Sequence, residues 1–220
     1  GYAQALAEYQ KLYDNKSRIL KDYRERPSLL DPLPEFNYRM AQVGSILISY
    51  RARYLQELSR QAAVYHMDFS GGKEQLSLLY QTVSTVTDPF AEKTEIFYQI
   101  LEHQQAHYHA ELESGQCLTG PHKDDFEAKL DELSVKAYGS QGQTRTAAIS
   151  LKLAERELFR RDTGEEPVLL LDDVLSELDA RRQDFVLNQI KTGQVLITCC
   201  EPERLTDIGK RILIEHGAVQ

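Results

Sequence analysis

The chemistry that this sequence could perform is concentrated in PVLLLDDVLSELD, residues 167–179. A run of apolar residues leads there into two adjacent carboxylates, Asp172 and Asp173. At the carboxyl end of a buried strand, where open α/β sheets bind ligands, one carboxylate could hold Mg²⁺ through a water molecule. The other could orient or deprotonate a water molecule for attack on a phosphoryl group. The alternative is that the pair merely ends the strand and caps the next helix.

A polar stretch about 30 residues earlier offers a second chemical feature. The residues SQGQ stand directly before a helix pattern with an apolar stripe on one face. Free backbone N–H groups, a hydroxyl and the positive end of a helix dipole make such a loop an anion site, and a glycine lets the main chain approach a phosphate. An ordinary N-cap loop is the alternative, but the acidic strand end that follows favours phosphate binding. The candidate phosphate contacts are Ser140, Gln141, Gly142 and Gln143.

Helical spacing of apolar residues dominates the first half of the chain. It predicts helices at residues 2–24, 36–66 and 90–112, interrupted by the proline-rich RPSLLDPLP and the turn DFSGGKE. QLSLLYQTV, residues 75–83, is predicted as a strand. Residues 1–113 are therefore expected to form a mainly α-helical lobe.

The second half of the chain alternates between strand and helix patterns. We predict strands at DFEAKLD and LSVKAYG, then a helix to about Arg161, a strand at 168–171, a helix at 177–190, and strands at 194–200 and 211–219. The continuous run VLLL is typical of a strand covered on both faces, and the order strand–helix–strand indicates a parallel α/β sheet. Residues 114–220 are therefore expected to form a second lobe.

Three motifs in order resemble those of one protein family. TGPHKDD, YGSQGQTRTAAISLKLAE and PVLLLDDVLSELDARR are similar to the pattern of the RecF family, recombination mediators related to SMC and ABC-type ATPases. In that likeness GSQGQ stands at the signature loop, VLLLDD at the Walker B strand and SELD at the D-loop. The resemblance covers the whole chain. It implies an α/β fold consisting of part of an ABC-type ATPase lobe, with a parallel sheet and helices, joined to a mainly α-helical arm lobe.

The resemblance also implies roles for single residues. Asp172 would hold Mg²⁺ through water, and Asp173 would be the general base, where most ABC-type ATPases have Glu. Ser140, Gln141, Gly142 and Gln143 would bind the γ-phosphate of ATP held by a second subunit. Asp179 would lie at the dimer seam. Thr198 is a candidate phosphate sensor, at a point where many ABC-type ATPases have a switch His.

The function that the resemblance implies is bacterial DNA repair, recombination and replication, including the SOS response. ATP and Mg²⁺ are the implied cofactors, for an ATP-dependent homodimer that hydrolyses ATP slowly on double-stranded or gapped DNA. The implied partners are RecR and, with RecO, RecA at single-strand gaps, and the implied location is the cytoplasm, with the nucleoid. The alternative is a non-catalytic scaffold module of an SMC-like protein that binds DNA or another protein.

The phosphate loop G-x-x-x-x-G-K-S/T does not occur in the sequence. SGGKE, residues 70–74, has neither the spacing nor the Ser or Thr after Lys, so it cannot build that phosphate cradle. In this family the loop precedes the arm lobe. We therefore expect the chain to be the C-terminal part of a longer protein, without ATPase activity by itself.

Any DNA contact must be local, because the chain carries a net charge of −8. Residues 1–66 are locally basic, with ten Lys and Arg against seven Asp and Glu. A solvated helix face is the alternative interpretation. The candidate contacts to the DNA backbone are Arg18, Lys21, Arg24, Arg51 and Arg53.

Other features carry less weight. No apolar run is long enough for a membrane span, and the three cysteines show no metal-binding or disulfide pattern. His103, His107 and His109 form a cluster with two histidines four apart, but a surface helix is a better interpretation of them than a metal site. His122 and Lys123 of TGPHKDD either face a nucleotide or brace a junction between elements.

Overall fold

The computed structural model describes residues 1–82, 85–175, 178–190, 192–200, 209–215 and 218–219. These residues form two compact units, Gly1–Leu158 and Phe159–Gln220. Among the described residues, no helix is both long enough and apolar enough to cross a membrane.

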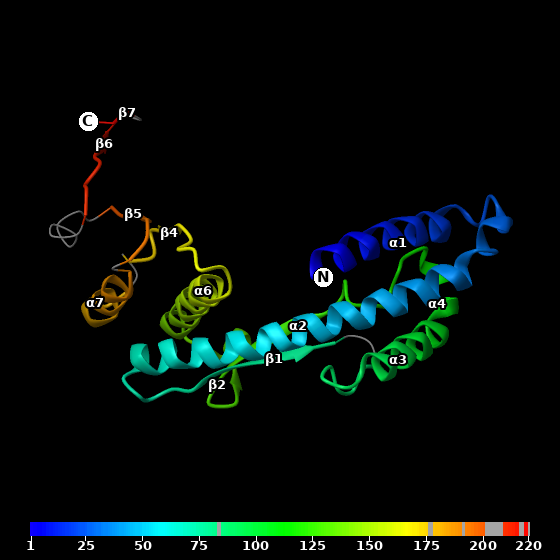
Figure 1. Ribbon diagram of the computed structural model, residues 1–220, viewed down its shortest axis with the longest axis horizontal. Helices are drawn as coiled ribbons and strands as arrows, with labels where there is room; N and C mark the ends of the chain where they lie inside the picture. Colours follow the sequence, from blue (N-terminus) through cyan, green and yellow to red (C-terminus); the bar gives the residue numbers. More distant parts are fainter. Residues whose placement is uncertain (83–84, 176–177, 191, 201–208, 216–217, 220) are drawn as a thin grey trace. The chain divides into compact units, whose positions relative to one another are not determined.

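Long helices make up most of the first unit (Figure 1). The predicted helices are confirmed, except that the third is two helices because His107 leaves helical backbone geometry (φ −99°, ψ 3°). The proline-rich break contains a short 3₁₀ turn at Pro27–Leu30. The helices are α1 (Tyr2–Asp22), α2 (Leu33–Ser70), α3 (Lys93–Ala106) and α4 (Tyr108–Ser114).

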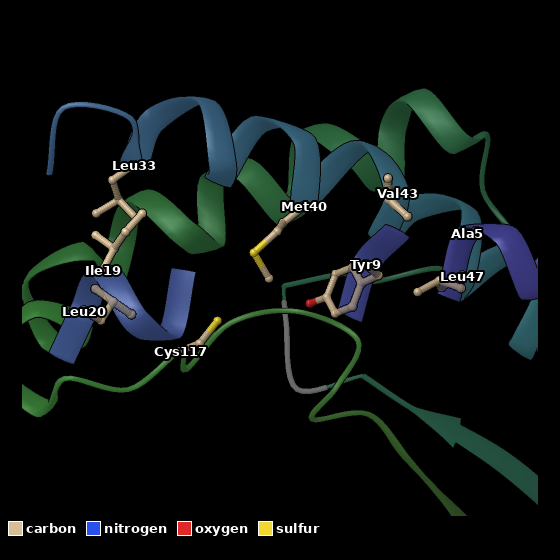
Figure 2. Close-up of a cluster of buried hydrophobic side chains, with 9 residues drawn as sticks. All are labelled: Ala5, Tyr9, Ile19, Leu20, Leu33, Met40, Val43, Leu47 and Cys117. Atoms are coloured by element: carbon tan, nitrogen blue, oxygen red, sulfur yellow. The ribbon is translucent and has the colours of Figure 1, made fainter. Parts of the chain in front are cut away.

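The core between α1 and α2 comes from their apolar faces. Figure 2 shows Leu33 and Met40 of α2 pointing toward α1, with Cys117 contributed by the loop after α4. Burying such side chains contributes roughly 1.5–3 kcal/mol each, so this cluster fixes the two helices against each other. Its buried members are Ala5, Tyr9, Ile19, Leu20, Leu33, Met40, Val43, Leu47 and Cys117.

A small antiparallel sheet lies beside α2 (Figure 1). Strand β1 (Leu76–Gln81) pairs with β2 (Asp125–Leu130), and β2 pairs with β3 (Leu133–Ser134). Residues on both sides of position 113 therefore share one sheet, and the two-lobe division at that position stays a prediction.

The predicted strand at LSVKAYG is wrong beyond its first two residues. After β3 the chain forms the short helix α5 (Val135–Tyr138), closed by a hydrogen bond from Gly139 N to Val135 O. A Cβ atom on Gly139 would lie 2.5 Å from that oxygen, so only glycine fits there. Tertiary packing decides this segment, because Val135 is buried in a cluster drawn from four other elements.

That cluster holds helix α6 (Gln141–Thr163) against α2 and the sheet. The α6 contribution comes from the apolar stripe predicted from the sequence, although Leu151 is only partly buried. The buried members are Leu55, Leu58, Ala62, Leu76, Leu130, Val135, Ala147, Ala154 and Leu158.

The second unit contains a parallel pair of strands, as predicted. Strand β4 (Leu169–Asp172) pairs with β5 (Val195–Thr198), and α7 (Ala180–Gln189) lies between them in the chain. Strands β6 (Ile214–Glu215) and β7 (Ala218–Val219) pair antiparallel. The parallel register confirms the α/β class of this part.

The expectation that VLLL is covered on both faces is wrong within the described residues. Leu169 and Leu171 are buried, but Leu170 is 67% exposed. Alternate residues of a strand point to opposite faces. The face of β4 with Leu169 and Leu171 is therefore buried, and the face with Leu170 is exposed.

Candidate functional site

The acidic pair stands at the carboxyl end of the parallel strands. Asp172 is the last residue of β4 and lies in register with Thr198, the last residue of β5. The Thr198 hydroxyl donates to Asp172 Oδ1 at 2.5 Å and accepts from the Asp173 N–H at 3.0 Å. One threonine side chain thus holds the Asp172 carboxylate and the backbone that follows it.

The backbone turns sharply at Asp173. Its φ is +50°, in the left-handed region that few residues other than glycine adopt. The Asp173 N–H also lies 3.2 Å from the Thr198 carbonyl oxygen, so the ladder between the strands continues to this residue. Asp173 is therefore fixed in an uncommon conformation at an exposed strand end, as is frequent at functional sites.

The residues present fit a hydrated Mg²⁺. Thr198 donates to Oδ1 of the exposed Asp172 carboxylate. The other carboxylate oxygen can accept hydrogen bonds from metal-bound water. Among the described residues, no group of three or more His, Cys, Asp or Glu could hold a metal ion. A single carboxylate oxygen of this kind suits an ion that takes most of its ligands from water and phosphate.

Part of the SELD segment lies outside the described residues, namely Ser176 and Glu177. Asp179 is described, and its carboxylate caps α7 by accepting from Arg182 N at 3.0 Å. The buried Gln183 amide donates to Leu175 O at 2.6 Å and Leu178 O at 3.0 Å. The described ends of this segment are thus fastened to α7.

Contrary to the prediction, the polar stretch SQGQ is not a loop ahead of the helix, because α6 already begins at Gln141. Ser140 and the first turn of α6 form a reciprocal cap. Ser140 Oγ accepts from Gln143 N at 3.2 Å, and Gln143 Oε1 accepts from Ser140 N at 2.9 Å. These bonds satisfy two of the N–H groups that the start of a helix leaves without helical partners. Ser140 and Gln141 are exposed, and Gly142 and Gln143 are partly buried. The loop is therefore open to a ligand, but its polar groups already bind one another.

The structure gives the Gln143 amide a further partner that the sequence did not indicate. Gln143 Nε2 donates to Glu74 Oε1 at 2.7 Å, and the other Glu74 oxygen lies 3.2 Å from Nε2 of the buried His66. Glu74 belongs to the SGGKE turn, whose sequence cannot build a phosphate cradle. The 69 positions between Glu74 and Gln143 explain why no local pattern could reveal the contact.

The candidate DNA contacts differ in how the structure uses them. Arg18, Lys21 and Arg53 are exposed. Arg24 is exposed too, and it donates to Glu113 O at 2.9 Å. Arg51 is half-buried and donates to Pro121 O and to the Tyr2 hydroxyl, so part of its guanidinium braces the protein itself.

The TGPHKDD segment is fastened to the helices around it. His122 Nε2 donates to Cys117 O at 3.1 Å, which leaves Nδ1 to accept from the Tyr9 hydroxyl at 3.0 Å. Burial lowers the pKa of His122, which favours this neutral form. A Cβ on Gly120 would lie 2.2 Å from the Tyr9 hydroxyl oxygen. Of the two roles considered for His122, the structure assigns it the bracing one.

A buried ion pair, which no sequence pattern indicates, supports the same segment. Lys16 Nζ lies 2.6 Å from Glu111 Oε2, with both side chains at most 1% exposed. Glu111 Oε1 accepts from Leu118 N at 2.9 Å and from the Thr119 hydroxyl at 3.0 Å. Glu111 therefore ties α1 and α4 to the start of TGPHKDD.

His103 of α3 packs in the interior, and His107, just after the helix, is partly buried. His103 is 7% exposed, and its ring centroid lies 4.0 Å from that of His107. Burial, followed by the nearby His107, lowers the pKa of His103. The expectation of a surface helix is thus wrong for His103, while His109 is exposed.

Comparison with known proteins gives one consistent likeness. No family model matches the chain. It is 36% identical over 202 residues to the DNA replication and repair protein RecF of Acetivibrio thermocellus, covering 92% of this chain and 54% of the relative. It is 37% identical over 198 residues to RecF of Agathobacter rectalis, covering 90% and 52%. The chain spans about half the length of the curated relatives it matches.

Two solved structures share the fold. Both are of the recombination mediator protein RecF in the RecFOR pathway, one described as RecF-ATP and one as RecF-ATPrS. Their TM-scores are 0.86 and 0.84, each at 31% identity. They cover 100% and 99% of this chain, and this chain covers 58% of each.

Proposed function

We propose, since this chain belongs to the RecF family, that it supplies the signature loop, the acidic strand end and the helical arm of an ATP-dependent DNA repair protein. In this proposal Asp172 holds Mg²⁺ through water and Asp173 is the general base for ATP hydrolysis. When bound, the ion would neutralise charge on the phosphate oxygens. Thr198 keeps the Asp172 carboxylate in position through their hydrogen bond.

The signature loop would act on ATP held by a second copy of the protein. Ser140 would turn its hydroxyl and backbone N–H toward the γ-phosphate, and Gln141 and Gly142 would offer the N–H groups of the first turn of α6. The family's phosphate loop, which this sequence lacks, would grip the β-phosphate in the full-length protein. ATP would then join two subunits, with Asp179 near the seam between them.

DNA and the partner proteins complete the proposal. The exposed Arg18, Lys21 and Arg53 would contact DNA phosphates, with a salt-dependent affinity. The ATP dimer would recruit RecR and, together with RecO, help to load RecA at gaps. Hydrolysis would be slow, because the shorter Asp173 replaces the glutamate usual in ABC-type ATPases.

One observation carries this proposal above the others. Asp172 stands at the carboxyl end of a parallel strand pair, fixed by a hydroxyl from the neighbouring strand. This is where open α/β sheets bind phosphate-containing ligands, and a carboxylate there suits hydrated Mg²⁺.

The test is Mg²⁺-dependent ATP hydrolysis by the full-length protein. Asp172→Ala should lower the rate at least about 100-fold, because charge stabilisation through the ion is lost. Asp162→Ala, at an exposed position of α6, is the matched control and should hydrolyse ATP as the parent does. Parental hydrolysis by Asp172→Ala would contradict the site. DNA binding that is indifferent to ATP would instead favour the scaffold alternative.

A further inference from the structure

A line of polar contacts runs from the signature loop into the arm helix α2. Gln143 Nε2 donates to Glu74 Oε1 at 2.7 Å, Glu74 Oε2 lies 3.2 Å from His66 Nε2, and His66 Nδ1 lies 3.4 Å from Ser150 Oγ. We propose that Glu74, held by His66, is a positioning residue that keeps the signature loop ready for the phosphate. This inference rests on the function proposed above.

The Gln143 side-chain amide has a fixed orientation between two partners. A glutamine amide has an oxygen that accepts and an NH₂ group that donates. Gln143 uses the oxygen to cap Ser140 N at 2.9 Å and the NH₂ group to reach Glu74. The Ser140 N–H favours the oxygen on its side, and the Glu74 carboxylate, which only accepts, favours the NH₂ group on the other. Glu74 therefore anchors the far end of the amide and reinforces the orientation that caps Ser140.

Glu74 is itself held firmly. Its N–H donates to Ser70 Oγ at 3.2 Å, within a turn that Gly71 and Gly72 allow by adopting φ values of +66° and +78°. The Glu74 side chain is 22% exposed and its partner His66 is 0% exposed. A charge-assisted hydrogen bond that is largely shielded from water is stronger than one on the open surface.

At the other end of this line of contacts, Ser150 is hydrogen-bonded within α6. The Ser150 hydroxyl donates to Thr146 O at 2.8 Å and Thr146 Oγ1 donates to Gly142 O at 2.6 Å, so buried hydroxyls follow α6 back to its first turn. The apolar cluster shared by α2 and α6 keeps these side chains in place. The signature loop is thus attached to α2 through Glu74 and through α6.

These contacts order the signature loop before the nucleotide binds. With Glu74 in place, the first turn of α6 is capped and Ser140 is ordered at the exposed end. Without it, the NH₂ group of Gln143 loses its acceptor and the side chain is held at one end only. More of the loop must then be ordered when the phosphate binds, which weakens binding. Glu74→Ala should therefore raise the ATP concentration for half-maximal dimerisation about tenfold, the value of one hydrogen bond to a charged group.

The experiment measures ATP-induced dimerisation of the full-length protein by sedimentation, together with KM and kcat. Glu74→Ala should raise the half-maximal ATP concentration and KM but leave kcat at saturating ATP within about twofold. Lys73→Ala, in the same turn with an exposed side chain, is the control and should match the parent. If Glu74→Ala dimerised at the same ATP concentration as the parent, the inference would be overturned. A fall in kcat as large as the rise in KM would overturn it too.

A paired substitution separates positioning from folding. Gln143→Glu keeps an acceptor for Ser140 N but places a carboxylate against the Glu74 carboxylate, so dimerisation should weaken. Adding Glu74→Gln restores a donor–acceptor pair and should recover most of the loss. Failure of this rescue in a folded double variant would overturn the inference, even if Glu74→Ala does not fold. A parent protein that does not dimerise with ATP would overturn the proposed function as well.

Discussion

Thr198 and Asp172 are bound to each other across two strands, with the threonine hydroxyl donating to the carboxylate at 2.5 Å. The same hydroxyl accepts from the Asp173 N–H at 3.0 Å. A phosphate sensor at Thr198 would need this hydroxyl to leave Asp172. We therefore propose that positioning Asp172 is its first role, while phosphate sensing stays a prediction.

Thr198→Val tests this relationship with almost no change of volume. The Asp172 carboxylate and the Asp173 N–H both lose a partner, so ATP hydrolysis by the full-length protein should fall about tenfold. Thr198→Ser keeps the hydroxyl and should restore most of the rate. Equal rates for the Val and Ser variants in a steady-state assay would contradict the assignment.

Asp173→Asn removes the proposed general base but keeps a side chain that tolerates the left-handed backbone at φ +50°. The variant should bind ATP and remain dimeric, because hydrolysis no longer releases the dimer. Sedimentation with ATP measures the dimer, and phosphate release measures hydrolysis. Hydrolysis at the parental rate would refute the base assignment.

Ser140→Arg places a long cation in the exposed loop that would meet the second subunit's nucleotide. ATP-dependent dimerisation should be lost, because the reciprocal cap with Gln143 is broken and the phosphate site is filled. Ala148→Arg, at an exposed position two turns along α6, should dimerise as the parent does. An unchanged sedimentation profile for Ser140→Arg would count against the contact in trans.

The ion pair between Lys16 and Glu111 makes a prediction about stability. Lys16→Met leaves a buried carboxylate without its cation, which should lower the free energy of unfolding by about 3–5 kcal/mol. Adding Glu111→Gln should restore most of it, since the amide oxygen still accepts from Leu118 N and the Thr119 hydroxyl. Urea unfolding measures the free energy of unfolding of both variants. A double variant that is no more stable than Lys16→Met would contradict the role of the ion pair.

His122 should make the stability of the arm depend on pH. Burial lowers its pKa in the folded protein below the usual 6.5, so the unfolded chain binds the proton first as pH falls. Its stabilising contribution is therefore present above pH 6.5 and is lost toward the lowered folded pKa. His103, whose pKa is also lowered, adds to the same trend.

His122→Gln tests this pH dependence, because glutamine keeps one donor and one acceptor without titrating. Urea unfolding between pH 8 and pH 5 should show a shallower loss of stability in the variant than in the parent. A parental slope would mean that other groups set the acid sensitivity.

The elements that the sequence predicted well are those determined by neighbouring residues. The long helices follow from apolar spacing, and the parallel pair follows from two apolar runs on either side of a helix. The segment at Val135–Tyr138 was missed because its strand-like alternation is overridden by the burial of Val135 and by the closed turn at Gly139.

The contacts that the sequence could not predict join distant positions. Lys16 and Glu111 come from different helices, and Glu74 meets Gln143 across 69 positions. Each of these side chains resembles an ordinary surface charge or amide when read in its own segment. Only the packing of α1, α2, α4 and α6 gives these side chains their partners.

The open face of β4 has a consequence for handling the protein. Leu170 and Leu196 are direct neighbours across the two strands, 67% and 52% exposed. Each square ångström of apolar surface removed from water contributes about 25 cal/mol. Any molecule that covers this leucine pair is therefore bound more favourably. Dilution, mild detergent and the avoidance of kosmotropic salts such as sulfate should therefore limit self-association of the chain through this face.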